Sequence, residues 1–386
     1  MPVPSSRKSP VFSRWLVGVI GVIGFVGLVA GALQLGGCTP APKLPPELAT
    51  FYQQMQDNAQ RFPRDGGAWL EHFGDAPYYG LAFYVHTDGN GAIASAARDH
   101  NIETLRHAQT EGGWFLENLE ETMMSTLGLI EYVSVTGDRA PLPDIEATID
   151  TINALTLGLR RYIDIDAGMF AIRTYGPTAI TAAIGLLNVQ YASLLAPVID
   201  PARGAASVDF ARDIVATIDE KAWDGHRYRI KPGDDLLELY PNTMMMLVLA
   251  RLYIQTGDSA YRERAEAAYR AIAPLRSARG GYRSPYSAQE MGAKTDDYST
   301  LSSQNYLTLA LAVMYEATGE QVYFDEAMFV FDFVRTHLYD PATGHLLHHW
   351  IDGRIAVPTD PEYFCTGCNF QFIYAIWYLQ NNRVQS

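Results

Sequence analysis

Carboxylates gather in four short stretches of the sequence, and such side chains can donate and accept protons in a reaction. Cleavage of a glycosidic bond commonly uses two of them, one protonated and one ionised. We rank Asp297 first as a catalytic acid or base, Asp235 second and Glu121 third. The alternative is that these carboxylates have no catalytic role and stabilise helix N-termini by interacting with the helix dipole. The full set is Asp296 and Asp297; Asp234, Asp235 and Glu238; Glu117, Glu120 and Glu121; and Glu362.

Three histidines lie close together, at His345, His348 and His349. Imidazole can shuttle protons near neutral pH or ligate a metal ion. The residues around them alternate as in a strand, which would place His345 and His349 on one face and His348 on the other. We therefore take His349 as a fourth catalytic candidate and His345 as a substrate contact. Packing within a loop, or exposure to solvent, is the alternative.

Cys365 and Cys368 are separated by two residues. Such a pair can form a disulfide, a redox couple or half of a zinc site. A site of four cysteines is excluded within one chain, because the sequence holds three Cys. We predict a disulfide, no metal and no cofactor. Zinc held by the two cysteines with a nearby His or Glu362 is the open alternative.

Residues suited to holding a polar ligand recur near the same stretches. Aromatic rings offer flat apolar faces to a sugar. An arginine can bind a ligand carboxylate through two hydrogen bonds. The arginines of these stretches could equally well pair with neighbouring Asp and Glu residues. Asparagine caps helices, the favoured interpretation here, or points into a cleft. Asparagines near expected helix starts are Asn118, Asn242, Asn305 and Asn369. The substrate-binding candidates are Trp114, Arg173, Tyr240, Asn242, Arg283, Asn305, His345 and Trp350.

The elements that must position these residues are pairs of helices. Residues 242–272 predict a helix that is apolar almost all round, a tight turn at Gly257 and Asp258, and a second helix with one polar face. The first helix is expected to be buried and the second to cover it. Similar inner helices are expected to start near Thr122, Ala179, Asn305 and Asn369.

The helix pairs recur along the chain. Thr-Gly dipeptides end three inner helices at Thr136, Thr256 and Thr318, with separations of 120 and 62 residues. A period of about 60 residues indicates an array of helical hairpins. The segment before each inner helix holds a glycine turn, an aromatic or His residue and short β-like alternation, which suggests a binding face. Outer helices are expected at residues 144–162, 207–221, 259–273 and 323–338.

The region before the first marked repeat is less regular. Residues 47–61 and 93–108 are compatible with helices, and residues 74–92 read as a glycine- and aromatic-rich loop or hairpin. Within it, Asp88-Gly-Asn-Gly resembles a fragment of a calcium loop, but the remaining ligands, including a Glu at the right place, are missing. We predict a β-turn there.

Five inner helices, with a sixth hairpin from the N-terminal region, would form an all-α (α/α)6 toroid with short β-like loops at its mouth. In this the chain resembles the six-hairpin glycosidase-like superfamily. Residues 339–350, Tyr-Asp-Pro-Ala-Thr-Gly-His-Leu-Leu-His-His-Trp, look like the Asp-x-x-Thr-Gly-x-x-x-His loops of its unsaturated uronyl hydrolases. The resemblance implies a substrate cleft where the inner helices begin, with Asp as acid/base in uronyl hydrolases and His in epimerases.

The N-terminus reads as an export signal. Positive charges at Arg7, Lys8 and Arg14 precede the uncharged, mostly apolar residues 15–35. Leu-Gly-Gly-Cys38 then resembles a bacterial lipobox, in which the Cys is lipidated and becomes the new N-terminus. We expect a signal peptide at 1–37, a Pro-rich linker at 38–46 and the toroid domain at 47–386, tethered to a membrane and facing the periplasm or exterior. An uncleaved membrane anchor is the alternative.

Composition narrows the functional classes. The net charge is −14 over 386 residues. Removal of residues 1–37 takes away three positive charges and no negative ones, so the remainder carries −17. Such an acidic body disfavours nucleic-acid binding, and the glycine pairs lack the spacing of a phosphate loop. We expect a protein that acts on an oligosaccharide or envelope glycan, by hydrolysis through a carboxylate acid/base. Sugar epimerisation by mouth histidines, and a non-catalytic glycan- or protein-binding scaffold, are the alternatives.

Overall fold

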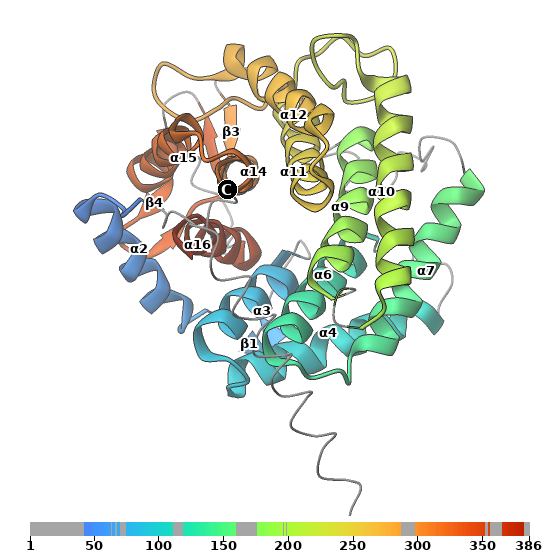
Figure 1. The fold of residues 1–386 in the computed structure, drawn as a ribbon. Helices are drawn as coiled ribbons and strands as arrows, with labels where there is room; N and C mark the ends of the chain where they lie inside the picture. The colour runs from blue at the N-terminus through green and yellow to red at the C-terminus, as the bar shows by residue number, and fades with distance from the viewer. Residues whose placement is uncertain are drawn as a thin grey trace, which may run out of the picture.

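The computed structural model describes residues 42–62, 64–65, 68–69, 75–110, 119–159, 176–195, 197, 199–286, 298–351, 354–355 and 365–381. Within these residues, α-helices alternate between an inner and an outer ring (Figure 1). The inner helices are α3 (Asp75–Asp88), α6 (Leu119–Thr136), α9 (Pro177–Leu194), α11 (Leu239–Thr256), α14 (Leu301–Thr318) and α16 (Thr366–Asn381). The outer helices are α2 (Pro46–Ala59), α4 (Ala92–Thr110), α7 (Leu142–Leu159), α10 (Pro201–Ala222), α12 (Ser259–Ala271) and α15 (Gln321–Phe333).

The ring closes between the two ends of the chain. The last inner helix, α16, packs against the first, α3, and the outer helix α2 contacts α16 (Figure 1). The ring centroid of Phe51 in α2 lies 6.1 Å from those of Phe331 in α15 and Phe372 in α16. The predicted (α/α)6 toroid is therefore confirmed, and within the described residues the N-terminal region supplies the sixth inner helix, α3, as expected.

The unit α11–α12 shows why the sequence alternates between apolar and amphipathic helices. Every residue of α11 from Leu239 to Ala250 is buried, whereas the buried residues of α12 are Ala265 and Ala268. Gly257 adopts φ +71°, a left-handed conformation that costs glycine little. The Asp258 side chain then accepts a hydrogen bond from the Ala260 N–H at 3.0 Å. Both predicted helices and the predicted turn are confirmed.

The predicted outer helices match α7, α10, α12 and α15 within a few residues, and the inner helix predicted without a Thr-Gly turn is α9. The largest difference is at the start of α10, which begins at Pro201. Asp200 caps this helix, because its Oδ1 accepts from the N–H groups of Ala202 and Arg203 at 3.0 and 3.2 Å. After α15, the chain continues as a π-helical turn over Val334–Leu338.

The prediction of a loop or hairpin over residues 74–92 is wrong, because most of this segment forms the inner helix α3. Residues 78–85 are all buried. A helix that is surrounded by neighbours has no polar face, so its sequence lacks the amphipathic period that marks a surface helix. The helix ends at Gly89, where φ is +61°. The Gly91 N–H donates to the Asp88 carbonyl, which is the predicted β-turn.

Short antiparallel strands gather where inner helices begin, as the β-like alternation predicted. β3 (Tyr298–Thr300) leads directly into α14 and pairs with β6 (His349–Ile351), which pairs with β7 (Arg354–Ile355). Two further hairpins are β1 (Arg64–Asp65) with β2 (Ala68–Trp69), and β4 (Tyr339–Asp340) with β5 (His345–Leu346). The single strand expected across the histidines is wrong, because the chain leaves the ladder at residues 347–348 and places His345 and His349 in different strands.

Within the part of the chain that the structure describes, no helix combines the length and apolar character needed to cross a bilayer. The predicted signal segment 1–37 and Cys38 lie outside the described residues.

Candidate functional site

An axial cavity lies between the inner helices and has two adjoining parts. The mouth part lies near the helix starts, and Glu120, Ile180 and Tyr240 are among its lining residues. The deep part reaches toward the C-terminal ends of the helices, where Gln190, Arg251 and Tyr378 line it. The two parts are continuous, since Met124, Ala183, Met244 and Tyr306 line both.

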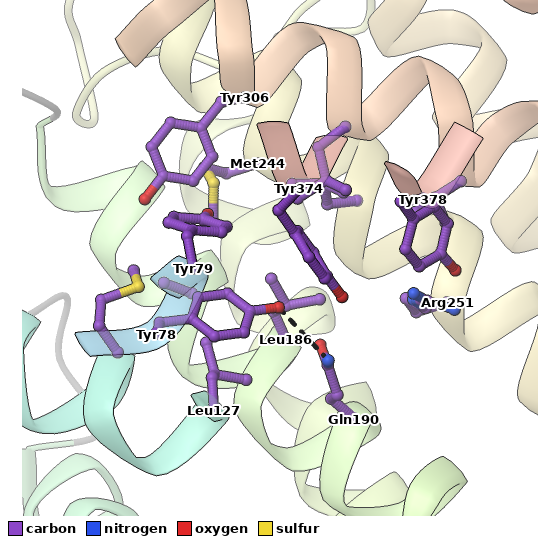
Figure 2. A pocket seen from close by; sticks show the side chains of 15 residues that line it. Tyr78, Tyr79, Leu127, Leu186, Gln190, Met244, Arg251, Tyr306, Tyr374 and Tyr378 are labelled. Carbon is purple, nitrogen blue, oxygen red and sulfur yellow. Dashed lines mark hydrogen bonds between the residues drawn. The ribbon is translucent and has the colours of Figure 1, made fainter. Parts of the chain in front are cut away.

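Tyrosines form much of the cavity wall (Figure 2). The rings of Tyr78 and Tyr79, neighbours in α3, have centroids 4.3 Å apart. Tyr306 of α14 lies 6.3 Å from Tyr79 and 6.0 Å from Tyr240. Burial, followed by the nearby Glu131, raises the pKa of Tyr374, so its hydroxyl stays protonated and can donate. Such a wall offers both flat apolar faces and hydroxyl groups, a combination suited to sugar rings.

A buried carboxylate, Glu131 of α6, lies behind the deep part. Its Oε1 accepts from Gln190 Nε2 at 2.7 Å and from the Tyr374 hydroxyl at 3.1 Å. Its Oε2 lies 3.1 Å from Nε2 of His86, and the His86 ring stacks on Trp377 at 4.1 Å. Four different inner helices therefore meet at one carboxylate, which fixes the positions of the cavity-lining Gln190 and Tyr374.

The second polar cluster of the deep part centres on Arg251 of α11 (Figure 2). Its Nη1 donates to Glu316 Oε2 at 3.3 Å, and its guanidinium carbon lies 5.1 Å from the Tyr378 ring centroid. The Tyr378 hydroxyl also donates to Glu316. Burial by itself would lower the pKa of Arg251. The nearby Tyr378 and Glu316 raise this pKa by more than burial lowers it, so the arginine is charged. The positive charge of Arg251 at the bottom of the cavity is thus already paired with the Glu316 carboxylate.

Carboxylates mark the opposite end of the cavity. Glu120 lines the mouth part. Its neighbour Glu121 is half-buried, and burial raises the pKa of Glu121 against the opposing effect of His100. The first turn of α6 therefore supplies a carboxylate at the cavity, although the adjacent residue was the one predicted.

Glu238, immediately before α11, is completely buried. Its Oε2 accepts from the Tyr286 N–H at 2.7 Å, and no donor among the described residues reaches Oε1. Burial raises the pKa of Glu238 to about 7, against the backbone N–H groups that stabilise its charged form. This carboxyl is half protonated near neutral pH, a property that general acids often have. It does not line either part of the cavity, so we assign it no catalytic role.

Asn242 and Asn369 brace the loops that precede their helices, and the interpretation of Asn242 and Asn305 as N-caps is wrong. The N-cap positions are occupied by Glu238 and Thr300. The Asn242 side chain instead accepts from the Tyr228 N–H at 2.9 Å and donates to the Tyr228 carbonyl at 3.1 Å. Asn305 donates to the Cys368 carbonyl at 2.7 Å.

The same brace recurs in the last repeat, where Asn369 accepts from the N–H of Leu346 at 2.9 Å and donates to its carbonyl at 3.1 Å. In α14 the neighbouring residue Gln304 takes this role with Tyr282. The amide side chains therefore position the mouth loops before α11, α14 and α16, and an amide residue one turn inside the helix is a sequence signal of these three repeats.

Of the remaining predicted residues, Tyr240 lines the mouth part, and its hydroxyl lies 3.4 Å from Thr300 Oγ1. Asp235 is 89% exposed and 3.8 Å from Arg229, apart from the cavity lining. Arg283 donates to the Pro274 carbonyl at 2.7 Å. His345 stacks on Phe62 at 5.7 Å, and burial lowers the pKa of His345 while Asp340 opposes this. Among these four residues, the structure places Tyr240 at the cavity.

Several predicted residues cannot be placed. Asp297, Trp114, Arg173 and Cys38 lie outside the described residues, as do the side chains of His349 and Trp350. The predicted pair Cys365 and Cys368 stands at the start of α16, where their sulfurs are bonded and their Cα atoms lie 5.3 Å apart.

Sequence reasoning missed the deep polar residues. Glu131, Arg251 and Glu316 each interrupt the apolar C-terminal half of an inner helix, five, five and two residues before its last residue. A single charge inside a buried helix requires a buried partner. This pattern could have predicted that the three charges meet polar groups of other helices at one depth in the toroid.

No protein-family model and no curated protein sequence matches the chain. Solved structures do share its fold. A D-mannose isomerase aligns with a TM-score of 0.61 at 13% identity, over 88% of this chain and 99% of that one. Cellobiose 2-epimerase from Spirochaeta thermophila aligns at 0.57 with 11% identity, over 87% and 98%. An unsaturated glucuronyl hydrolase specific for heparin aligns at 0.53 with 13% identity, over 86% and 95%.

These structures belong to the six-hairpin glycosidase-like superfamily, the resemblance that the repeat pattern indicated. Since the identities are low, the similarity establishes the architecture and not the reaction. The chain has the (α/α)6 fold of the six-hairpin glycosidase-like proteins.

Proposed function

We propose that this chain is a carbohydrate-active enzyme that hydrolyses oligosaccharides, with a sugar ring bound in the axial cavity. The observation that carries the proposal is a cavity whose walls include several tyrosine rings and whose mouth carries a carboxylate, Glu120. Tyrosine faces and hydroxyls suit a sugar ring, and hydrolysis of its linkage needs a carboxyl that exchanges protons. Glu120 is the described candidate for this role, and Asp297, which directly precedes β3 in the sequence, is the second.

Epimerisation or isomerisation is the second candidate, because a mannose isomerase and a cellobiose 2-epimerase are among the structures that share the fold. That chemistry was expected to use mouth histidines. No histidine is found among the described residues that line the cavity, and His345 packs against Phe62. We keep hydrolysis as the first proposal, because the described mouth residue able to exchange a proton is Glu120.

A screen of neutral and uronate oligosaccharides, read by mass spectrometry, tests the reaction. The parent chain is expected to release shorter products, and Glu120→Gln or Asp297→Asn to lower the rate by about 100-fold or more, the usual loss for an acid/base group. Asp235→Asn is the matched control, because this exposed carboxylate lies apart from the cavity lining, and its rate should equal that of the parent.

Other outcomes of the same screen separate the alternatives. A product of unchanged mass but altered configuration would establish an epimerase or isomerase in place of a hydrolase. Binding without turnover, equal in the parent and all three variants, would exclude an enzyme and leave a glycan-binding scaffold.

We also propose that the domain is held at a membrane by a lipid on Cys38 and faces the periplasm or exterior. Support comes from the apolar segment at residues 15–35 followed by Leu-Gly-Gly-Cys. Intact-mass measurement of the detergent-extracted protein should give an N-terminus at Cys38 with a lipid adduct, and Cys38→Ser should retain residues 1–37 without lipid. A parent protein that keeps residues 1–37 would instead be an uncleaved membrane anchor.

A further inference from the structure

Two cysteines and a histidine converge at the start of α16. One ring nitrogen of His348 and the sulfurs of Cys365 and Cys368 all lie within 4.8 Å of one another. Both cysteines are buried and His348 is half-buried. The histidine comes from the short segment between β5 and β6, whereas the cysteines bracket the first turn of the helix. The sequence therefore brings three metal-binding side chains together from two separate segments.

The surrounding backbone fixes the two segments relative to each other. Asn369, one residue after Cys368, holds both backbone groups of Leu346. The His348 carbonyl accepts from the Leu301 N–H at the start of α14, at 2.8 Å. Asn305 of the same helix donates to the Cys368 carbonyl at 2.7 Å. Helices α14 and α16 thus form a rigid frame around the three side chains, which is how proteins prearrange metal ligands.

The three side chains favour zinc over calcium or magnesium. The Cys368 N–H points to Cys365 Sγ at 3.0 Å, and a helix N-terminus stabilises a thiolate once the sulfurs are reduced. Two thiolates and an imidazole suit zinc far better than calcium or magnesium. With Zn–S of about 2.3 Å and Zn–N of about 2.0–2.1 Å, tetrahedral ligand atoms lie roughly 3.4–3.8 Å apart. The nitrogen is already within reach, and the sulfurs need only separate after reduction.

We propose that Cys365 and Cys368, when reduced, bind a zinc ion together with His348, and that the disulfide is the oxidised, metal-free state of the same site. Reduction of the Cys365–Cys368 disulfide to two thiols takes two electrons and two protons from an external dithiol, which is itself oxidised to a disulfide. Zinc then displaces both thiol protons. Three protein ligands leave a fourth position for water or another group. None of these three residues is among the described residues that line the cavity, and zinc binding is measured directly, so the proposal does not depend on the reaction proposed above.

The test uses the full chain with Cys38→Ser, so that Cys365 and Cys368 are the remaining thiols. The protein is reduced anaerobically with a dithiol, the reductant is removed, and zinc or cobalt(II), its spectroscopic probe, is titrated. We expect one zinc ion per chain, a thiolate-to-cobalt absorption band, and protection of both cysteines from alkylation, counted by intact mass. The oxidised chain should show none of these.

Variants assign the ligands. His348→Ala should weaken zinc binding by more than about 100-fold, the upper end of the loss seen when only a supporting residue is changed. His345→Ala is the matched control, since this histidine packs on Phe62, and its affinity should equal that of the parent. Zinc binding that is absent in the reduced parent, or equal in His348→Ala and the parent, would overturn the proposal. The alkylation result in the parent decides the matter even where a variant fails to fold.

Discussion

Replacement of Arg251 by methionine is expected to lower the free energy of unfolding by about 3–5 kcal/mol, the usual cost of removing one partner of a buried ion pair. The side chains of Arg251 and Glu316 are 14% and 12% exposed. Methionine fills a similar length of the cavity wall, so the main loss is electrostatic. Glu316 would keep its hydrogen bond from Tyr378 but would remain as a buried carboxylate without a cation.

Urea titration of the parent and of Arg251→Met measures this loss of stability. Two further variants test whether the loss comes from the buried ion pair. Arg270→Met is the surface control, because Arg270 is 67% exposed and its partner Glu266 lies 3.7 Å away. Its cost should stay below about 0.5 kcal/mol. The double variant Arg251→Met/Glu316→Gln should recover part of the lost stability, since it removes the unpaired charge. A double variant no more stable than Arg251→Met would contradict this account.

The architecture was predictable because both helices of each repeat have a recognisable sequence pattern. An inner helix such as α11 is apolar on all sides and ends at a left-handed glycine, and an outer helix such as α12 has one polar face. The same logic failed for α3, whose tyrosines and glycines resemble a hairpin when read alone. In the folded protein α3 packs between α6 and α16, and α16 is almost 300 residues later in the sequence, so these neighbours are not visible in the local pattern.

The site was predictable only in outline. Residue types placed carboxylates at the starts of the inner helices, and Glu120 lines the mouth of the cavity. Sequence alone could not tell Glu120 from Glu121, because the choice depends on the rotation of α6 about its axis. It also treated Asn242 as a cap or a ligand contact, whereas the structure uses it to hold the backbone of Tyr228. Contacts between distant segments decide such roles.

Glu238 leads to the second large prediction: Glu238→Gln should make the protein more stable than the parent above neutral pH. The pKa of this buried carboxyl is about 7 in the folded protein, against 4.5 for a glutamate exposed to water as in the unfolded chain. The folded state therefore binds the proton more tightly than the unfolded state does. Stability from this proton is fully present below pH 4.5 and is lost as the pH rises through 7.

The difference corresponds to about 3 kcal/mol, at about 1.4 kcal/mol for each pH unit between the two pKa values. Glutamine keeps an oxygen that can accept from the Tyr286 N–H and carries no charge at any pH. Urea titrations should therefore show similar stability for parent and variant near pH 4.5, and an advantage of up to about 3 kcal/mol for the variant at pH 8. Glu263→Gln, on the exposed face of α12, is the matched control and should follow the parent at both pH values. If the advantage of Glu238→Gln is the same at both pH values, the pKa of this carboxyl does not differ between the folded and unfolded protein, and this account of its burial is wrong.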